Sequence, residues 1–324
     1  MKYILCFLTP FFLLTTPLET LSRELVFSGG PDGGTFKYFA RGITDYSNAK
    51  LNITIRSEPS AGSVENMKKV NNREADLGIT YSGDLYLGRN GFLVGKRSRQ
   101  YRNVYALSYL YGAPAHLVVL KSSGINSIFD LAFGKSIAIG KVGSGSATAA
   151  QRLFDGLKIW SKIQPRYIGF NEGAEALMAK QVDALWVFAG FPNSAVTRVA
   201  SMGVIKLLPI HRDVEEKSDF FADHPFYSKV IIPSGTYHGV DYDVVTYQDS
   251  TLLTAGRNVS VDAVEKILET IYTPEGLAYL VRVKSTAKDM SIDSGLTGIV
   301  TPLHRGAMKF WKSKGKILNS QQTK

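Results

Sequence analysis

Residues 136–148, SIAIGKVGSGSAT, combine an apolar run, a glycine-rich turn and the beginning of a helix. The apolar run 136–140 is typical of a short buried strand, and 143–148 form the turn. An apolar stripe indicates that a helix follows, and it contains Ala150, Leu153, Phe154 and Leu157. A strand, a glycine turn and a helix in this order predict an α/β protein in which helices cover a parallel sheet.

The N-terminal part of the chain has the same order of patterns. An apolar strand at 23–27 precedes a glycine-rich turn at 28–35, and an amphipathic helix begins near Thr35. In both parts a second strand and a second helix follow, and then an apolar strand that an aspartate introduces, Asp76 or Asp183. The sequence therefore predicts a structural repeat of two α/β units.

These patterns predict two lobes joined by two crossing strands. The apolar run 115–120 would carry the chain from the first lobe into the second, and a return crossing is expected within 244–254. We expect lobe I to comprise residues 23–118 and 250–324, and lobe II to comprise 119–249. Such an arrangement is a hinged clamshell, which binds ligands between its lobes.

The first 22 residues have the pattern of a secretory signal peptide. Lys2 supplies a positive charge, and 4–14 form an apolar run that is too short to span a bilayer as a helix. A buried N-terminal helix is the alternative, but Pro10 and Pro17 would interrupt it. The single cysteine, Cys6, lies in this segment, so we expect an exported mature protein without disulfides or thiolate sites.

Composition and charge exclude further classes of protein. Of the 324 residues, 44% are hydrophobic and 20% are charged, which is typical of a folded domain rather than a disordered or membrane-spanning chain. The formal net charge is +10, and residues 305–324 supply +6 of it without any acidic residue. We interpret this end as a solvated, partly disordered extension, and we predict no nucleic-acid partner.

The two glycine turns are the strongest candidates for a binding site. The start of a helix leaves backbone N–H groups unpaired and carries a partial positive charge, so it attracts carboxylate or phosphate groups. Ser144, Ser146 and Thr148 add hydroxyl groups to the second turn. A single turn of this kind commonly just connects a strand to a helix, but two turns at equivalent places in two lobes can face one cleft.

Other classes of site have no support in the sequence. Thr35 stands where a P-loop after Gly29–Gly34 needs lysine, and no dinucleotide-type glycine motif begins a helix, so no nucleotide cofactor is predicted. The G-x-S-x-G elbow of esterases is absent, and the five histidines are scattered without metal-ligand spacing. We therefore predict a protein that is not an enzyme and that uses neither a metal nor a cofactor.

Six motifs occur in the order found in one family of solute receptors. They are Gly33-Gly34-Thr35, Gly62-Ser63-Val64-Glu65-Asn66, Glu74-Ala75-Asp76-Leu77-Gly78, Gly143-Ser144-Gly145-Ser146, Ala189-Gly190-Phe191-Pro192-Asn193 and Ile232-Pro233-Ser234-Gly235-Thr236-Tyr237. Together they resemble the TAXI-type solute receptors of tripartite ATP-independent periplasmic (TRAP) transporters. The resemblance covers about residues 25–279.

The resemblance implies a periplasmic receptor with a two-lobed, type II-like periplasmic-binding-protein fold, and we expect a monomer. Such a receptor captures a small anionic solute, an amino acid or an organic acid such as glutamate or a dicarboxylate. It then delivers the solute to a membrane permease that an ion gradient drives. A ligand-binding component of a signalling or surface-exposed system is the alternative, because one clamshell serves both roles.

The resemblance also implies a set of ligand-contacting residues. They are Gly34, Thr35, Ser63, Tyr81, Ser144, Gly145, Ser146, Ala147, Thr148, Phe188, Pro192 and Asn193. Tyr81-Ser82-Gly83 departs from the Gln-Ser-Asp-like sequence that is common in the family at this place. The polar contact from lobe I is therefore expected to differ, and the identity of the solute stays open.

Overall fold

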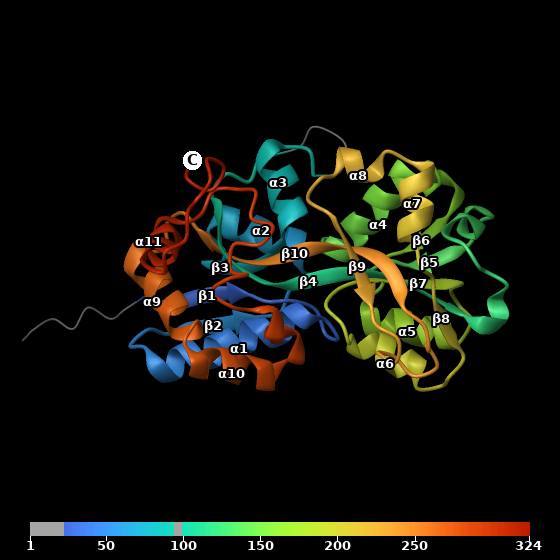
Figure 1. Cartoon of the computed structure of the whole chain (residues 1–324), viewed down its shortest axis with the longest axis horizontal. Coiled ribbons are helices and arrows are strands. Elements are labelled where there is room, and N and C mark those ends of the chain that lie inside the picture. The colour runs from blue at the N-terminus through green and yellow to red at the C-terminus, as the bar shows by residue number, and fades with distance from the viewer. Residues whose placement is uncertain (1–22, 94–98) are drawn as a thin grey trace, which may run out of the picture.

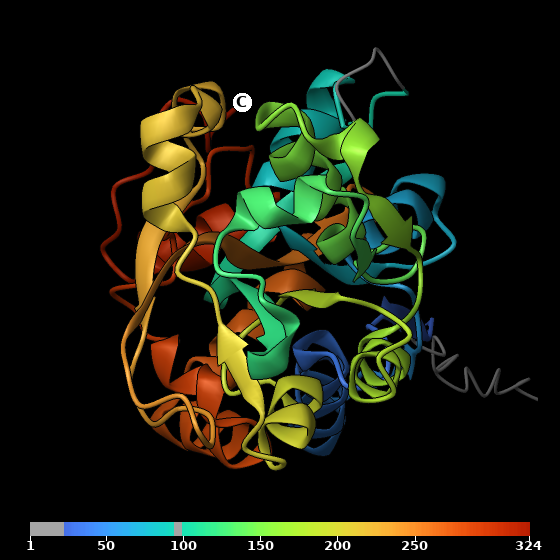
Figure 2. The ribbon, with the colours of Figure 1, turned by 90° about the vertical axis from the view of Figure 1, so that its right-hand side faces the viewer.

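The computed structural model of the chain describes residues 23–93 and 99–324, so the signal peptide predicted at 1–22 lies outside the described residues. Ten strands form one curled sheet with the order β2-β1-β3-β10-β4-β7-β5-β6, to which β8 and β9 add at β4 and β10. Helices cover both faces of this sheet (Figures 1 and 2). The predicted α/β class with two lobes and two crossings is confirmed.

Lobe I contains the elements on the β3 side of β10. Its parallel strands are β1 (Leu25–Ser28), β2 (Ile55–Glu58) and β3 (Leu77–Tyr81), and β1 lies between the other two. The helices that follow these strands are α1 (Thr35–Lys50), α2 (Ser63–Asn72) and α3 (Ser82–Asn90). Three helices near the C-terminus complete the lobe, α9 (Val261–Ile271), α10 (Pro274–Val283) and α11 (Arg305–Ser313).

Lobe II contains the elements on the β7 side of β4 and repeats this order. Its parallel strands are β5 (Ser136–Ala138), β6 (Gln164–Arg166) and β7 (Ala184–Phe188), with β5 between the other two. Their helices are α4 (Gly145–Gly156), α5 (Phe170–Met178) and α6 (Ser194–Ala200). The remaining elements are β8 (Ile205–Leu207), α7 (His211–Lys217), α8 (Phe220–Asp223) and β9 (Ser228–Ile232).

The predicted repeat is present, and the two aspartates make equivalent contacts. Asp76 accepts the backbone N–H of Val26 in β1 at 3.0 Å, and Asp183 accepts that of Ser136 in β5 at 2.8 Å. Each carboxylate therefore joins the loop before the third strand of its unit to the first strand. This contact explains why an aspartate stands at the same place in both units.

Two long antiparallel strands connect the lobes. They are β4 (Val104–Leu120) and β10 (Val244–Gly256), and they pair from Gln248 opposite Pro114 to Gly256 opposite Val104. The first crossing starts earlier than the run 115–120 from which it was predicted. Three tyrosines and Ser108 in 104–113 hid this start, although that part of the strand is almost entirely buried. Short 3-10 helices lie at Lys121–Ser123, Ile128–Ala132, Trp160–Lys162 and Ser285–Asp289.

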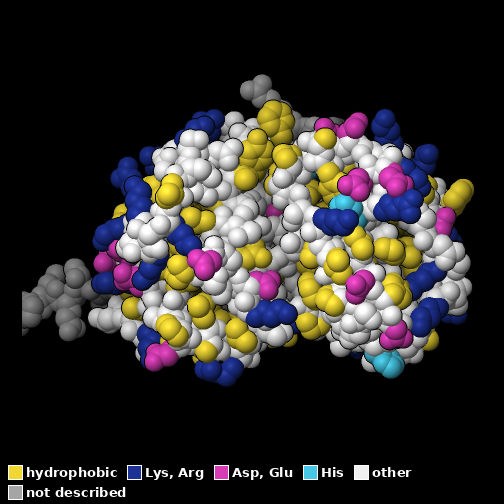
Figure 3. Space-filling view, viewed as in Figure 1, with side chains coloured by type: hydrophobic (Ala, Val, Ile, Leu, Met, Phe, Trp, Pro, Cys, Tyr) yellow, Lys and Arg dark blue, Asp and Glu magenta, His cyan; other side chains and the backbone are white. Residues whose placement is uncertain are grey.

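The prediction of a solvated C-terminal extension is wrong. Helix α11 packs on α9, and both Phe310 and Trp311 are fully buried. The indole Nε1 of Trp311 donates to the carbonyl oxygen of Leu107 in β4 at 2.8 Å. The lysines lie on the other face of the helix, and Figure 3 shows Lys and Arg side chains, with several Asp and Glu, over this end of lobe I. A strongly amphipathic helix was thus mistaken for a basic tail.

No helix in residues 23–93 and 99–324 is long and apolar enough to cross a membrane.

Candidate functional site

The starts of four helices meet between the lobes, each just beyond the carboxyl end of a parallel strand. Helices α1 and α2 come from lobe I, and α4 and α5 come from lobe II. Ligands of α/β proteins commonly bind at this edge of a sheet. The residues that line the space are Pro31, Gly34, Thr35, Phe36, Ala61, Gly62, Ser63, Tyr81, Ser144, Gly145, Ser146, Phe170 and Ala189.

Backbone N–H groups in this cleft have no acceptor within the described residues. They belong to Thr35 and Phe36 of α1, Ser63 and Val64 of α2, and Gly145 and Ser146 of α4. Helix α5 differs, because Glu172 of its own first turn accepts the N–H of Gly169 at 3.0 Å. Three helix starts therefore present free donors and partial positive charge to one point.

No charged side chain lies among the thirteen lining residues. The hydroxyl groups are those of Thr35, Ser63, Tyr81, Ser144 and Ser146. The hydroxyl oxygen of Thr35 is buried without a hydrogen-bond partner within the described chain. The oxygen of Ser146 accepts the N–H of Phe188 at 3.2 Å, so its proton stays available to a ligand. The cleft therefore offers hydrogen-bond donors to a ligand, but its lining residues include no charged side chain.

The Tyr81 side chain lines this cleft and contacts both lobes. Its ring makes edge-to-face contacts with Phe36 of lobe I and Phe188 of lobe II, and its hydroxyl donates to the Phe188 carbonyl oxygen. Burial raises the pKa of the Tyr81 hydroxyl well above its usual value, so this group is a neutral donor. The remaining cavity has a volume of about 20 Å³, which is about the space of one water molecule. The lobes are therefore closed on each other.

Ser63 connects the cleft to a buried ion pair. Its hydroxyl donates to Asp84 at 2.7 Å and accepts the N–H of Tyr81 at 3.0 Å, so the hydroxyl is already occupied. Asp84 of α3 also accepts a hydrogen bond from Nη2 of Arg152 of α4, with 2.9 Å between Nη2 and Oδ1. Both side chains of this ion pair are at least 92% buried. Arg152 also donates to the hydroxyl of Tyr227. This pair joins lobe I to lobe II directly behind the cleft.

A second set of contacts closes the other side of the cleft. The side chain of Asn193 donates to the Gly33 carbonyl at 3.2 Å, and the Asn193 N–H donates to the Tyr237 hydroxyl at 2.9 Å. That hydroxyl lies 2.9 Å from Nε2 of His116, whose Nδ1 lies 3.0 Å from the Pro114 carbonyl. Burial lowers the pKa of His116 to about 4, so its neutral form accepts from Tyr237.

The structure brings together some of the residues that the resemblance indicated and not others. Gly34, Thr35, Ser63, Tyr81, Ser144, Gly145 and Ser146 line the cleft. Ala147 and Thr148 lie farther along α4 and line a different hollow. Phe188 is buried beside the cleft, Asn193 bridges the lobes, and the Pro192 carbonyl accepts from Lys284 at 3.0 Å. In residues 23–93 and 99–324, no group of three or more His, Cys, Asp or Glu is arranged to hold a metal ion.

Comparison with known proteins assigns the chain to a family. The NMT1-like family is matched by residues 27–315 of the chain. The chain belongs to the NMT1-like family. Similar solved structures include MatC from Rhodopseudomonas palustris with bound malate, at 17% identity, which covers 84% of this chain and 90% of that one with a TM-score of 0.53.

Two further structures with the same fold are a protein from Bordetella bronchiseptica RB50 and the substrate binding protein of an amino acid ABC transporter. The first is 14% identical over 90% of this chain and 98% of that one, with a TM-score of 0.52. The second is 11% identical over 83% of this chain and 100% of that one, with a TM-score of 0.51. At these identities the likeness shows the fold, which is that of the periplasmic binding proteins, as predicted.

Sequence reasoning missed the buried charges behind the cleft. Arg152 stands only seven residues beyond Gly145, and its partner Asp84 lies 68 residues away in the sequence. Arg152 shares its helix face with Thr148 and Asp155, so the local sequence predicts neither its burial nor its partner.

Proposed function

We propose that this chain is an exported receptor that binds a small anionic solute between its lobes. The observation that carries the proposal is the convergence of the α1, α2 and α4 starts, whose N–H groups have no partner within the described residues. Three partial positive charges favour one anion at their meeting point. The proposed contacts are the donors of Thr35, Ser63, Gly145 and Ser146, with Gly34, Tyr81 and Ser144 around them.

The lining favours an organic acid over an amino acid. A carboxylate can accept hydrogen bonds from the free N–H groups, but the cleft has no Asp or Glu side chain to pair with an ammonium group. Burial of an unpaired ammonium would be costly. A dicarboxylate is therefore the first candidate, ahead of glutamate. MatC, whose structure holds malate, shares the fold, which is consistent with this choice without determining it.

Solute binding is tested by thermal unfolding of the protein with malate, succinate, glutamate, lysine and glucose. A dicarboxylate at 100 times its Kd should stabilise the folded state by about 2.7 kcal/mol, whereas lysine and glucose should not. Ser146→Ala should weaken the binding by about tenfold, since it removes a hydrogen bond to a charged group. Ser161→Ala, in the exposed part of the 3-10 helix Trp160–Lys162, is the matched control. An equal effect of lysine, or no effect of any acid, would contradict the proposal.

Delivery to a TRAP permease from the periplasm is the second part of the proposal and rests on the resemblance to TAXI receptors. In this proposal, lobe I comprises residues 23–118 and 250–324, and lobe II comprises residues 119–249. Uptake by vesicles that contain the permease should require this receptor and an ion gradient, and it should continue without ATP. Uptake that stops when ATP is removed would indicate an ABC transporter instead. Binding without any uptake would favour a signalling role.

A further inference from the structure

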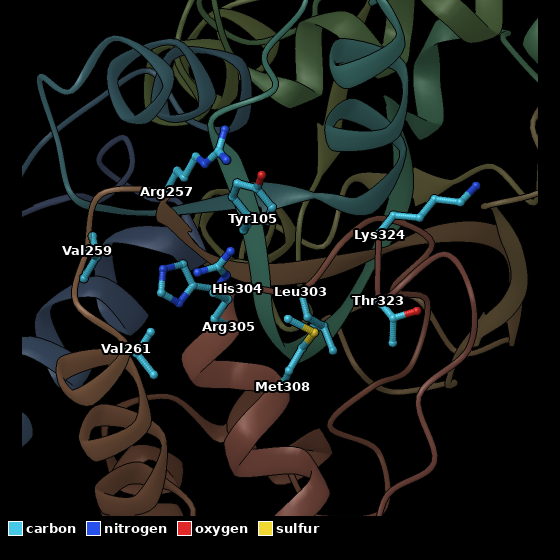
Figure 4. Close-up of a pocket in the computed structure, with 10 residues that line it drawn as sticks. All are labelled: Tyr105, Arg257, Val259, Val261, Leu303, His304, Arg305, Met308, Thr323 and Lys324. Atoms are coloured by element: carbon cyan, nitrogen blue, oxygen red, sulfur yellow. The ribbon is translucent and has the colours of Figure 1, made fainter.

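A second cavity of about 460 Å³ lies on lobe I, where β4, α9 and α11 meet. Its lining residues are Tyr105, Arg257, Val259, Val261, Leu303, His304, Arg305, Met308, Thr323 and Lys324 (Figure 4). None of these residues lines the interlobe cleft. The cavity is therefore separate from the site described above, and its size lies within the range of small-molecule pockets.

The charged side chains that line this cavity are all positive. Arg257, Arg305 and Lys324 form no ion pair within the described residues, and the ten lining residues include no Asp or Glu. Burial lowers the pKa of His304, so this ring adds no charge at neutral pH. The three cationic side chains that line the wall carry a charge of +3. Such a concave positive surface attracts anions.

Two further features of the wall fit an anionic ligand. Helix α9 begins at Val261 and helix α11 begins at Arg305, so two helix starts add partial positive charge to the same wall. In Figure 4, Arg257 and Arg305 lie on either side of the Tyr105 ring. Guanidinium groups bind carboxylate and phosphate with two hydrogen bonds, and they do so better than lysine.

Apolar side chains form the rest of the wall. Val259 and Leu303 are buried, and Val261 and Met308 also face the cavity. A bare inorganic ion would leave this surface unused, whereas an anion with an apolar body would cover it. The concave shape also suits a small molecule better than a flat membrane surface.

We propose that the cavity lined by Arg257, Arg305, Tyr105 and Met308 is a second binding site, which takes a small organic anion with a carboxylate or phosphate group on an apolar body. The arginines bind the anionic group, and Tyr105, Val261 and Met308 contact the apolar part. This site is independent of the solute in the interlobe cleft.

Titration calorimetry of the full chain with phenyl phosphate and with benzoate tests the proposal and separates the two anionic groups. R257Q/R305Q should weaken binding of the preferred probe at least twentyfold, because both guanidinium groups are lost. K312Q/K314Q removes the same charge from exposed lysines outside the cavity and should change the affinity less than twofold. All four substituted residues are exposed, so the variants should fold, which circular dichroism checks.

The cleft provides a further control. Gly145→Ala should leave binding of the probe unchanged, and R257Q/R305Q should retain the thermal stabilisation by the cleft solute. The proposal is overturned if neither probe binds at millimolar concentration, or if both charge variants bind equally. Binding to vesicles of phosphatidylglycerol without binding of either free probe would also overturn it, and would assign the arginines to a membrane surface.

Discussion

Tyr81 narrows the cleft at the starts of α1, α2 and α4. Its ring lies between Phe36 and Phe188, and its hydroxyl donates to a carbonyl of the opposite lobe. A solute larger than a water molecule needs this ring to move or the lobes to separate. The phenol then becomes available to the solute as a neutral hydrogen-bond donor.

Tyr81→Ala should enlarge the cleft and shift its preference toward longer acids. Removal of a buried aromatic ring costs about 3–5 kcal/mol of stability, so the free protein should melt at a lower temperature. The test is the thermal stabilisation by a series of dicarboxylates of increasing length, in the wild type, Tyr81→Ala and Tyr81→Phe. Tyr81→Phe keeps the ring and should keep the wild-type order. An unchanged order in Tyr81→Ala would show that this ring does not limit the solute.

His116 makes stability depend on pH. Burial lowers its pKa to about 4 in the folded chain, whereas an unfolded histidine has a pKa of about 6.5. Between these values the unfolded state binds more protons, so stability falls as the pH is lowered from 6.5 to 4. The loss that this residue causes is about 3 kcal/mol.

His116→Gln should flatten this part of the pH profile. The measurement is urea unfolding at several pH values between 4 and 7, compared with His238→Gln, an exposed histidine variant. The difference between the two profiles isolates His116 from the carboxylates that titrate in the same range. Identical slopes in both variants would contradict the role of His116.

At the scale of elements, the start of α4 is one of the parts of lobe II that contact lobe I. A Cβ at Gly145 would lie 2.5 Å from two ring carbons of Tyr81 and 2.7 Å from the Cβ of Ser63. Such distances are shorter than any ordinary contact, so one added methyl group would hold the lobes apart. Gly145 is therefore needed for closure, whereas α4 itself tolerates alanine.

Gly145→Ala should weaken solute binding at least tenfold and lower the melting temperature of the free protein, because the added methyl group disfavours the closed arrangement. Calorimetric titration measures the first effect and thermal unfolding the second. Gln151→Ala, on the same helix but outside the cleft, should bind as the wild type does. If Gly145→Ala binds the solute with unchanged affinity, the bound solute does not require the closed arrangement of α4 and Tyr81.

Sequence patterns predicted the elements that carry their own signals. Glycine turns beside apolar runs located β1, α1, β5 and α4, and the repeated aspartates marked equivalent strands. The start of α11 and its buried Trp311 were missed, because lysines dominate the composition of that segment. Contacts between lobes, such as Arg152 with Asp84, could not be predicted, since they join residues that only the closed fold brings together.

For the whole molecule, buried charges contribute to closure of the lobes. Arg152 of lobe II pairs with Asp84 of lobe I, and Asp249 accepts the N–H of Gly83 at 3.0 Å in the same buried region. Burial, together with the nearby charge of Asp84, raises the pKa of Asp249 well above its usual value. Arg152 thus pairs with Asp84, whereas burial disfavours the charged form of Asp249.

Arg152→Gln should favour the open molecule, because Asp84 would be left without a partner in a buried site. Loss of one partner of a buried pair costs about 3–5 kcal/mol. Small-angle scattering should show a larger radius of gyration than in the wild type, measured without solute. Arg212→Gln, which removes an exposed arginine, is the control. An unchanged radius in Arg152→Gln would mean that other contacts hold the lobes together.

The anionic group of a bound solute should lie at the start of α4. The direct measurement is a crystal structure of the chain with the dicarboxylate that stabilises it most. We predict a carboxylate oxygen within hydrogen-bond distance of the N–H groups of Gly145 and Ser146, and a second contact to the start of α1 or α2. A solute bound elsewhere, or a neutral or cationic group at the start of α4, would contradict the account.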